Sequence, residues 1–172
     1  MNHSSNTNAG GWKGCDLRYD VLGSTNTNDG DATATTATNP VANTLMAALP
    51  SDLRAVMQPM TIYTDNTGGG SDNASYVTKT TDYLPLLAEY EIFGTRTYAN
   101  SAEKNYQAQY AYYSAGNSKV KYRHSSTSST AWWWGRSPYY AGSIYFCVVY
   151  TNGGANYISA GNSFGVAPAF RV

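Results

Sequence analysis

Three adjacent tryptophans, Trp132, Trp133 and Trp134, constrain the fold of this chain more than any other feature. Successive side chains of an extended chain point to opposite faces, so the three rings cannot all face one way. The strongest strand pattern, "SIYFCVVYT", follows them at residues 143–151. We therefore expect at least one tryptophan to lie deep in a core, beside the apolar run "YLPLLAEYEIF" of residues 83–93.

Elsewhere the chain alternates short apolar runs with long polar stretches, and no apolar period persists for many turns. Pro and Gly punctuate these runs, as they do at the ends of short helices and strands. We expect helices over residues 40–49, 51–57 and 101–115, strands over 60–64, 143–151 and 164–172, and a surface loop over 22–40. This mixture predicts an α+β fold with a small irregular antiparallel sheet, two or more helices and long loops.

A chain of 172 residues is the size of one ordinary domain. We expect residues 1–10 to be a flexible lead-in and residues 11–172 to form a single domain. No signal-peptide pattern is visible, and no apolar run approaches the length that spans a membrane, so membrane insertion is not expected. The two cysteines, Cys15 and Cys147, lie far apart in sequence. Cys147 sits in an apolar run, which favours a buried free thiol.

The net charge is zero, but the charges are unevenly placed. All eleven acidic residues lie at or before Glu103, so residues 104–172 carry six basic residues and no acidic ones. A basic half can indicate nucleic-acid binding. Here only Lys119, Lys121 and Arg123 are clustered, and we expect the basic half to complement the acidic half within one fold rather than to bind nucleic acid.

The residues that usually carry catalysis are scarce. The only histidines are His3 and His124, and no acid near His124 in sequence would orient it in a hydrolase triad. No cluster of His, Cys, Asp and Glu has metal-ligand spacing, and the Gly-rich turn of residues 65–73 lacks the ending of a phosphate loop. Glu89 and Glu91 form an unaccompanied pair for which we expect a structural role. We expect no catalytic residues, no metal and no cofactor.

A different function is indicated by residues 137–170, which contain no Asp, Glu, His, Lys or Arg. Five tyrosines lie there among Ser, Gly and Asn. Tyrosine offers a large contact area with few torsions to freeze, and the small polar residues add adaptable hydrogen bonds, as in antibody recognition loops. The composition therefore favours a binding surface, with ordinary packing of the tyrosines on their neighbours as the alternative.

The chain resembles a bacterial and phage domain of the C-type-lectin-like fold in six motifs, which are "GGWKGCDLR", "LPSDLRAVMQPM", "TTDYLPLLAEYEIFG", "GNSKVKY", "WWWGRSP" and "FGVAPAF". Together they extend from Gly10 to Phe170. The C-terminal part is similar to the variable proteins of diversity-generating retroelements. In those systems a reverse transcriptase copies a template with errors at adenines, and the copy replaces the 3′ end of the target gene.

The resemblance implies a variable region of about residues 137–170 on a constant scaffold. Scaffold positions are Trp133, Arg136, Ser137, Pro138, Phe146, Cys147, Gly153 and the "GVAPAF" ending, with Gly135 where a Leu-like residue is expected. Variable, ligand-binding positions are Tyr139, Tyr140, Ser143, Tyr145, Tyr150, Asn156 and Tyr157, which we expect to share one exposed patch. Weaker candidates for variation, several of them compatible with core positions, are Gly142, Ile144, Val148, Gly154, Ile158 and Phe164.

Residue usage agrees with such a template. Changing the first two bases of an AAC or AAT codon never yields Lys, Gln, Glu, Met or Trp. These types fill 19 of the 172 positions, so about 3.5 are expected among residues 139–170, and none occurs. A turn-rich strand region also disfavours Lys and Glu, so the absence agrees with the resemblance without establishing it.

The function that the resemblance implies is binding of a protein or glycan on a cell surface, such as the receptor of a phage host. Multiple copies on a particle would raise a weak single-site affinity, and the expected location is the virion or the bacterial cell surface. The alternative is a surface or adhesion domain of the same fold that is not diversified. The formylglycine-generating enzyme of this fold class needs a cysteine-based copper site, which two distant cysteines do not favour.

Overall fold

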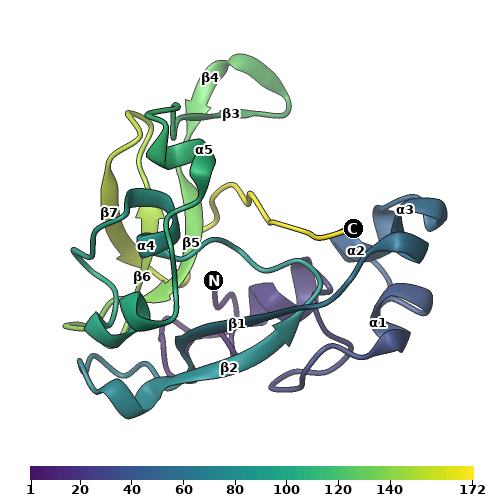
Figure 1. The fold of residues 1–172 in the computed structure, drawn as a ribbon, viewed down its shortest axis with the longest axis horizontal. Helices are drawn as coiled ribbons and strands as arrows, with labels where there is room; N and C mark the ends of the chain where they lie inside the picture. The colour runs from purple at the N-terminus through teal and green to yellow at the C-terminus, as the bar shows by residue number, and fades with distance from the viewer.

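Seven short strands form three small antiparallel sheets in the computed structural model, which describes residues 1–172 (Figure 1). The first pairs β1 (Met60–Asp65) with β2 (Val77–Asp82), and the second pairs β3 (Lys121–Arg123) with β4 (Ser126–Ala131). The third has the order β5 (Trp133–Pro138), β6 (Tyr145–Val149) and β7 (Ala155–Ser159). The predicted α+β class with small antiparallel sheets is confirmed, and the predicted strand 143–151 is β6.

The helices are all short, and no helix is both long enough and apolar enough to cross a membrane. The α-helices are α1 (Ala34–Thr38), α2 (Leu45–Ala48), α3 (Ser51–Val56), α4 (Glu89–Phe93) and α5 (Ala111–Ser114). Single turns of other geometry are η1 (Leu17–Val21), η2 (Ala74–Tyr76) and η3 (Ser101–Asn105). The helix expected at 51–57 is present as α3. The one expected from residue 40 begins only at Leu45, and α1 lies within the stretch expected to be a loop.

The helix predicted over residues 101–115 is wrong, because tertiary contacts interrupt it. The chain leaves η3 after Asn105 and runs beside α4, where the Tyr110 amide donates to the Glu91 carbonyl oxygen. The Tyr106 ring stacks on Tyr63 of β1, with ring centroids 4.4 Å apart. Hydrogen bonds and stacking to neighbouring elements thus replace the bonds of a continuous helix.

The strand predicted over residues 164–172 is also wrong. This segment makes only isolated bridges, one between Trp133 and Gly165 and one between Gln58 and Arg171. The Trp134 amide donates to the Gly165 carbonyl oxygen, and the Gly165 amide donates to that of Trp132. The closing segment therefore covers the free edge of β5 at one point and then crosses to the region of α2 and α3 (Figure 1).

The tryptophans divide the interior into two clusters, as the alternation of a strand requires. Trp134 is 1% exposed and belongs to the main core with Leu84, Leu86 and Phe146. Trp133, also 1% exposed, packs in a smaller cluster with Ile92 of α4. The expectation of a deeply buried tryptophan beside residues 83–93 is confirmed, and it holds for two of the three.

The N-terminal residues are not the flexible lead-in that the sequence suggested. Met1 is buried in the main core, and its amino group donates to the Ala160 carbonyl oxygen at 2.8 Å. Asn8 is fully buried. Nothing in the local composition of residues 1–10 indicates this, because the partners of Met1 and Asn8 include backbone groups more than 100 residues away in sequence.

Arg136 is the buried centre of a polar network that joins three parts of the chain. Its guanidinium donates to both carboxylate oxygens of Glu91 in α4, at 2.6 and 2.8 Å. It also donates to the Thr64 hydroxyl of β1 at 2.6 Å and to the Leu86 carbonyl oxygen at 2.8 Å. Burial alone would lower the pKa of Arg136, but the charge and hydrogen bonds of Glu91 together with Glu103 and Tyr110 outweigh burial, and the net shift of this pKa is upward. Arg136 thus remains charged and fully partnered.

A bulge in β5 places this side chain. Trp134 pairs with Val148 and Pro138 with Phe146, so three residues of β5 lie opposite one residue of β6. At Gly135 a Cβ atom would lie 3.3 Å from the Leu87 carbonyl oxygen, which leaves little room for a side chain. The Leu-like residue expected there does not fit this close approach.

Truncating Trp134 to Ala should lower the free energy of unfolding by about 3–5 kcal/mol, because a large ring is removed from a packed core. Tyr112, which is 56% exposed, provides the control: Tyr112→Ala should stay within about 0.5 kcal/mol of the parent. Denaturant melts of the two variants test this, and similar losses for both would contradict the assignment of the core.

Removing Arg136 should cost about 3–5 kcal/mol, because Arg136→Ala leaves the Glu91 carboxylate buried without its partner. The matched control is Arg96→Ala, since Arg96 pairs with Asp72 at 2.9 Å in a partly exposed position. That pair should contribute only about 0–1 kcal/mol. Equal losses in urea unfolding would show that the Arg136 network is not a special stabilising centre.

Candidate ligand-binding face

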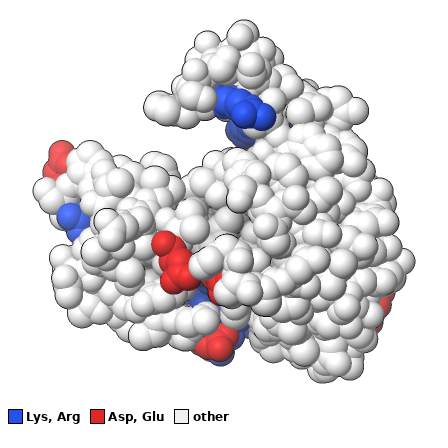
Figure 2. Space-filling model, turned by 180° about the vertical axis from the view of Figure 1, so that it is seen from behind, with Lys and Arg blue, Asp and Glu red and all other residues white.

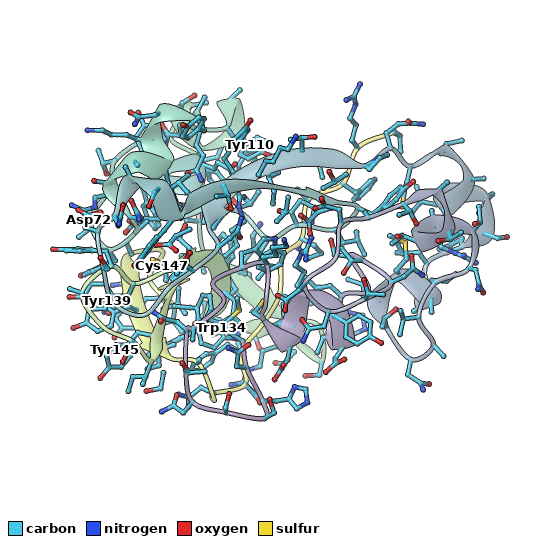
Figure 3. All side chains as sticks on the ribbon, turned by 90° about the horizontal axis from the view of Figure 1, so that it is seen from below. Asp72, Tyr110, Trp134, Tyr139, Tyr145 and Cys147 are labelled. Atoms are coloured by element: carbon cyan, nitrogen blue, oxygen red, sulfur yellow. The ribbon has the colours of Figure 1, made fainter.

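Five tyrosine side chains converge at one end of the third sheet, and we call them the tyrosine cluster: Tyr98, Tyr139, Tyr140, Tyr145 and Tyr157. The rings of Tyr139 and Tyr157 stack with centroids 4.1 Å apart. Tyr145 and Tyr98 each meet the Tyr157 ring edge-on, at 5.1 and 5.0 Å. Tyr140 packs edge-on against Tyr139 at 5.4 Å. Figure 3 shows Tyr139 and Tyr145 together at one end of the molecule.

The strand register explains this convergence. Cys147 of β6 pairs with Tyr157 of β7, and Tyr145 lies two residues before Cys147. Because side chains alternate along a strand, Tyr145 and Tyr157 emerge on the same face. Tyr139 follows the end of β5, and its amide donates to the Tyr145 carbonyl oxygen at 3.0 Å. The turn of residues 139–145 therefore folds its tyrosines over this face.

Tyr98 belongs to the cluster although sequence reasoning missed it. The buried Glu89 carboxylate accepts hydrogen bonds from the amides of Thr97, Tyr98 and Ala99 at 2.8–3.0 Å. The Tyr140 amide in turn donates to the Tyr98 carbonyl oxygen. Glu89 is thus a structural carboxylate that orders a loop, as the expected structural role implied.

Asn8 holds the turn of the cluster from behind, and it too was missed. Its side-chain amide donates to the carbonyl oxygens of Gly142 and Tyr145 at 2.7 and 2.9 Å. Its backbone amide donates to the Ser143 carbonyl oxygen at 2.8 Å, and its side-chain oxygen accepts from the Gly69 amide. A buried asparagine with every polar group partnered fixes a loop that has no regular structure of its own.

The cluster is largely uncharged. Its nearest cation is Arg96, whose guanidinium carbon lies 4.0 Å from the Tyr140 ring centroid and which also pairs with Asp72. Desolvation by burial, with further contributions from Tyr157 and Tyr140, raises the pKa of Tyr139, so its hydroxyl stays protonated at neutral pH. The rings are half-buried rather than fully exposed. They pack on one another and remain partly accessible to solvent.

Two of the seven stronger candidates lie elsewhere. Tyr150 follows β6 at its other end, where its ring meets Trp132 at 4.2 Å and packs against the main core. Asn156 precedes Tyr157 in β7 and therefore points to the opposite face of the sheet. The expected single patch is thus formed by Tyr139, Tyr140, Tyr145 and Tyr157, with the exposed Ser143 in the same turn, and not by Tyr150 or Asn156.

Three of the six weaker candidates for variation lie in the main core or pack against it. Val148 is 2% exposed in the main core, and Ile158 and Phe164 pack against it from partly buried positions. Gly142 and Ile144 lie in the turn of residues 139–145, and Gly154 lies between β6 and β7. The scaffold positions Trp133, Arg136, Ser137, Pro138, Phe146 and Cys147 are all buried.

A buried carboxyl group lies beneath this face. Glu103 of η3 accepts hydrogen bonds from the Ser137 hydroxyl at 2.6 Å, the Asp65 amide at 3.0 Å and the Gln107 side chain at 3.1 Å. Burial raises the pKa of Glu103 to about 7, against the lowering effect of these hydrogen bonds and of Arg136. The group therefore titrates near neutral pH inside the domain.

The reactive side chains offer little chemistry. Both cysteines are free and buried, and burial raises the pKa of Cys15 to about 12 and that of Cys147 well above its ordinary value. Thiols of that kind are not nucleophilic at neutral pH. The group able to offer three metal ligands is His3, Asp16 and Asp20, with ligand atoms within 4.8 Å of one another. This group lies at the surface. There the His3 Nδ1 atom lies 3.3 Å from a carboxylate oxygen of Asp16, and the His3 Nε2 atom lies 3.7 Å from one of Asp20.

The fold and this face define an α+β domain with one clustered aromatic surface. A family model, described as a domain of unknown function (DUF6273), matches residues 1–172, and the chain belongs to that family. The comparisons with curated proteins and with solved structures returned no match.

The stability of the domain should fall as the pH rises through the range in which Glu103 titrates. The folded pKa of about 7 lies above the ordinary carboxyl value, so the contribution of this group is fully present below about pH 4.5 and is lost by pH 7–8. Relative to Glu103→Gln, the parent should lose about 1–3 kcal/mol of unfolding free energy between pH 5 and pH 8. Parallel profiles for the two proteins would contradict the assignment.

Proposed function

We propose that this chain is a non-enzymatic binding domain of the C-type-lectin-like fold and the variable protein of a diversity-generating retroelement. Its ligand would be a protein or glycan on a cell surface, such as the receptor of a phage host. The location proposed with it is a virion or a bacterial cell surface, where multiple copies would strengthen weak single contacts.

The observation that carries the proposal is the convergence of Tyr139, Tyr140, Tyr145 and Tyr157. They come from a segment with no acidic or basic residue. Four ring contacts connect them, with centroids 4.1–6.1 Å apart. Tyrosines that are clustered and partly accessible are the residues that act as anchors in interfaces. Tyr98 adds a fifth ring from a part of the chain that would stay constant.

The scaffold is suited to surface variation. Backbone groups of the turn are held by Asn8, and the loop of Tyr98 is held by Glu89, so neither arrangement depends on the identity of the tyrosine side chains. The motif resemblance supplies the retroelement and the C-type-lectin-like assignment. The small antiparallel sheets, short helices and long loops of this chain are compatible with a C-type-lectin-like domain that serves as a variable protein.

The proposal is tested by sequencing this gene and its flanks from many isolates of one population. We expect a nearby reverse-transcriptase gene and an Asn-rich repeat matching the 3′ end of this gene. Substitutions should concentrate at codons 139, 140, 143, 145 and 157, with codons 1–136 nearly constant. Evenly spread substitutions without a template repeat would favour the surface or adhesion domain that is not diversified.

A matched pair of variants tests whether the face tolerates change. Tyr157→Ser should lower the free energy of unfolding by about 1–2 kcal/mol, because Tyr157 contacts three other rings. Tyr112→Ser, outside the face, should cost less than about 0.5 kcal/mol. Both variants should remain folded, as judged by near-ultraviolet circular dichroism and urea melts. Global unfolding of Tyr157→Ser would exclude this position from a diversified set.

A further inference from the structure

A second surface, remote from the tyrosine cluster, forms a groove of about 690 Å³ beneath the β3–β4 hairpin. The hairpin projects from the body of the domain (Figure 1). Seen from behind, it overhangs a hollow, with Lys and Arg side chains on its underside (Figure 2). One wall of the groove is the hairpin, the other is the closing segment around Phe164, and Trp132 lies between them.

The charge of this groove is one-sided. Lys121, Arg123 and His124 line it, and no carboxylate does. Neither Lys121 nor Arg123 takes part in an ion pair, and the chain has no acidic residue after Glu103. Lys121 has a cation–π contact with the Trp133 ring at 5.7 Å, but neither cation has an acidic partner. Cations without an acidic partner on a concave surface attract an anion. The expectation from the sequence, that the basic half is neutralised by the acidic half, therefore does not hold for these residues.

The floor and rim are aromatic. The Trp132 ring is flanked by Tyr150 and Phe164, with centroids at 4.2 and 5.1 Å, and is held by their packing against the main core. Tyr122 is 58% exposed on the hairpin and lines the same groove. An aromatic face carries negative potential and is complementary to the polarised C–H bonds on one face of a sugar ring. The hydroxyls of Thr130, Thr151 and Ser163 lie around it as possible partners for sugar hydroxyls.

We propose that this groove binds a carboxylated saccharide, with a sugar ring against the exposed Tyr122 ring beside Trp132 and the carboxylate toward Arg123 and Lys121. The volume lies within the range of small-ligand pockets. The cations and the exposed tyrosine of the site, Lys121, Tyr122 and Arg123, lie outside the predicted variable region, whereas Thr151, Ser163 and Phe164 lie inside it. The charged part of the site therefore does not depend on the retroelement proposal.

Two other anionic ligands fit less well. Proteins that bind single-stranded nucleic acid do so along an extended basic channel. In this chain, which has zero net charge, the cations of the groove are confined to one hairpin. A peptide is recognised either as an added strand at a free sheet edge or, when it is acidic, by a cluster of Arg side chains. Arg123 is the only arginine that lines this groove. Here the edge of β5 within the groove is already bonded to the backbone of Gly165.

The test uses the whole chain and measures affinity by calorimetry for sialyllactose, trigalacturonate and a hyaluronan tetrasaccharide. Lactose and the methyl esters of trigalacturonate and of the hyaluronan tetrasaccharide are the neutral counterparts. At least one acidic saccharide should bind, and its neutral counterpart should bind about tenfold more weakly or worse, because a charge-assisted contact is lost. The indole N–H resonance of Trp132, assigned by its absence in Trp132→Phe, should shift on binding.

Two pairs of variants locate the site. Arg123→Gln and Tyr122→Ala should each weaken binding about tenfold, whereas Lys104→Gln and Tyr112→Ala, at exposed positions outside the groove, should leave it unchanged. All four side chains are exposed, so the variants should fold. The proposal is overturned if no acidic saccharide binds, if neutral forms bind equally, or if Arg123→Gln has no effect. Tighter binding of decathymidylate or hexaglutamate would also overturn it.

Discussion

The ion pair between Arg136 and Glu91 is the interaction on which the arrangement of this domain depends. Three separate regions, β5, α4 and β1, present polar groups to one buried guanidinium. Each strand and helix is too short to be stable alone. A charge buried without partners would cost several kcal/mol, so the network is stable only when all three regions are in place. This requirement makes the short elements cooperative and selects one arrangement of them.

Buried polar groups also support the surface. Glu89 orders the loop of Tyr98, Asn8 orders the turn of residues 139–145, and Glu103 joins Ser137 to the backbone of β1. These groups hold backbone rather than surface side chains. The loop conformations beneath the face therefore depend on these buried groups, which lie outside the tyrosine cluster.

The tyrosine cluster and the basic groove lie at opposite ends of β6. Tyr145 begins the strand within the cluster, and Tyr150 follows its end beside Trp132. One short, well-packed sheet thus offers two surfaces of different chemistry, one nearly neutral and rich in tyrosine, the other cationic with a tryptophan floor.

The sequence alone determined the features that depend on local pattern: the α+β class, strand β6, helix α3, the deep burial of at least one of the three tryptophans, the free thiol of Cys147 and the structural role of the paired glutamates. Strand alternation and apolar runs are local signals, so these could be predicted. Tertiary structure decided the rest. The expected helix over residues 101–115 was interrupted by stacking on β1 and bonding to α4, and residues 1–10 were ordered by distant backbone groups. Tyr150 was separated from the other tyrosines, and Tyr98 was added to them, because a shared face is set by strand register and loop closure between residues that are far apart in the chain.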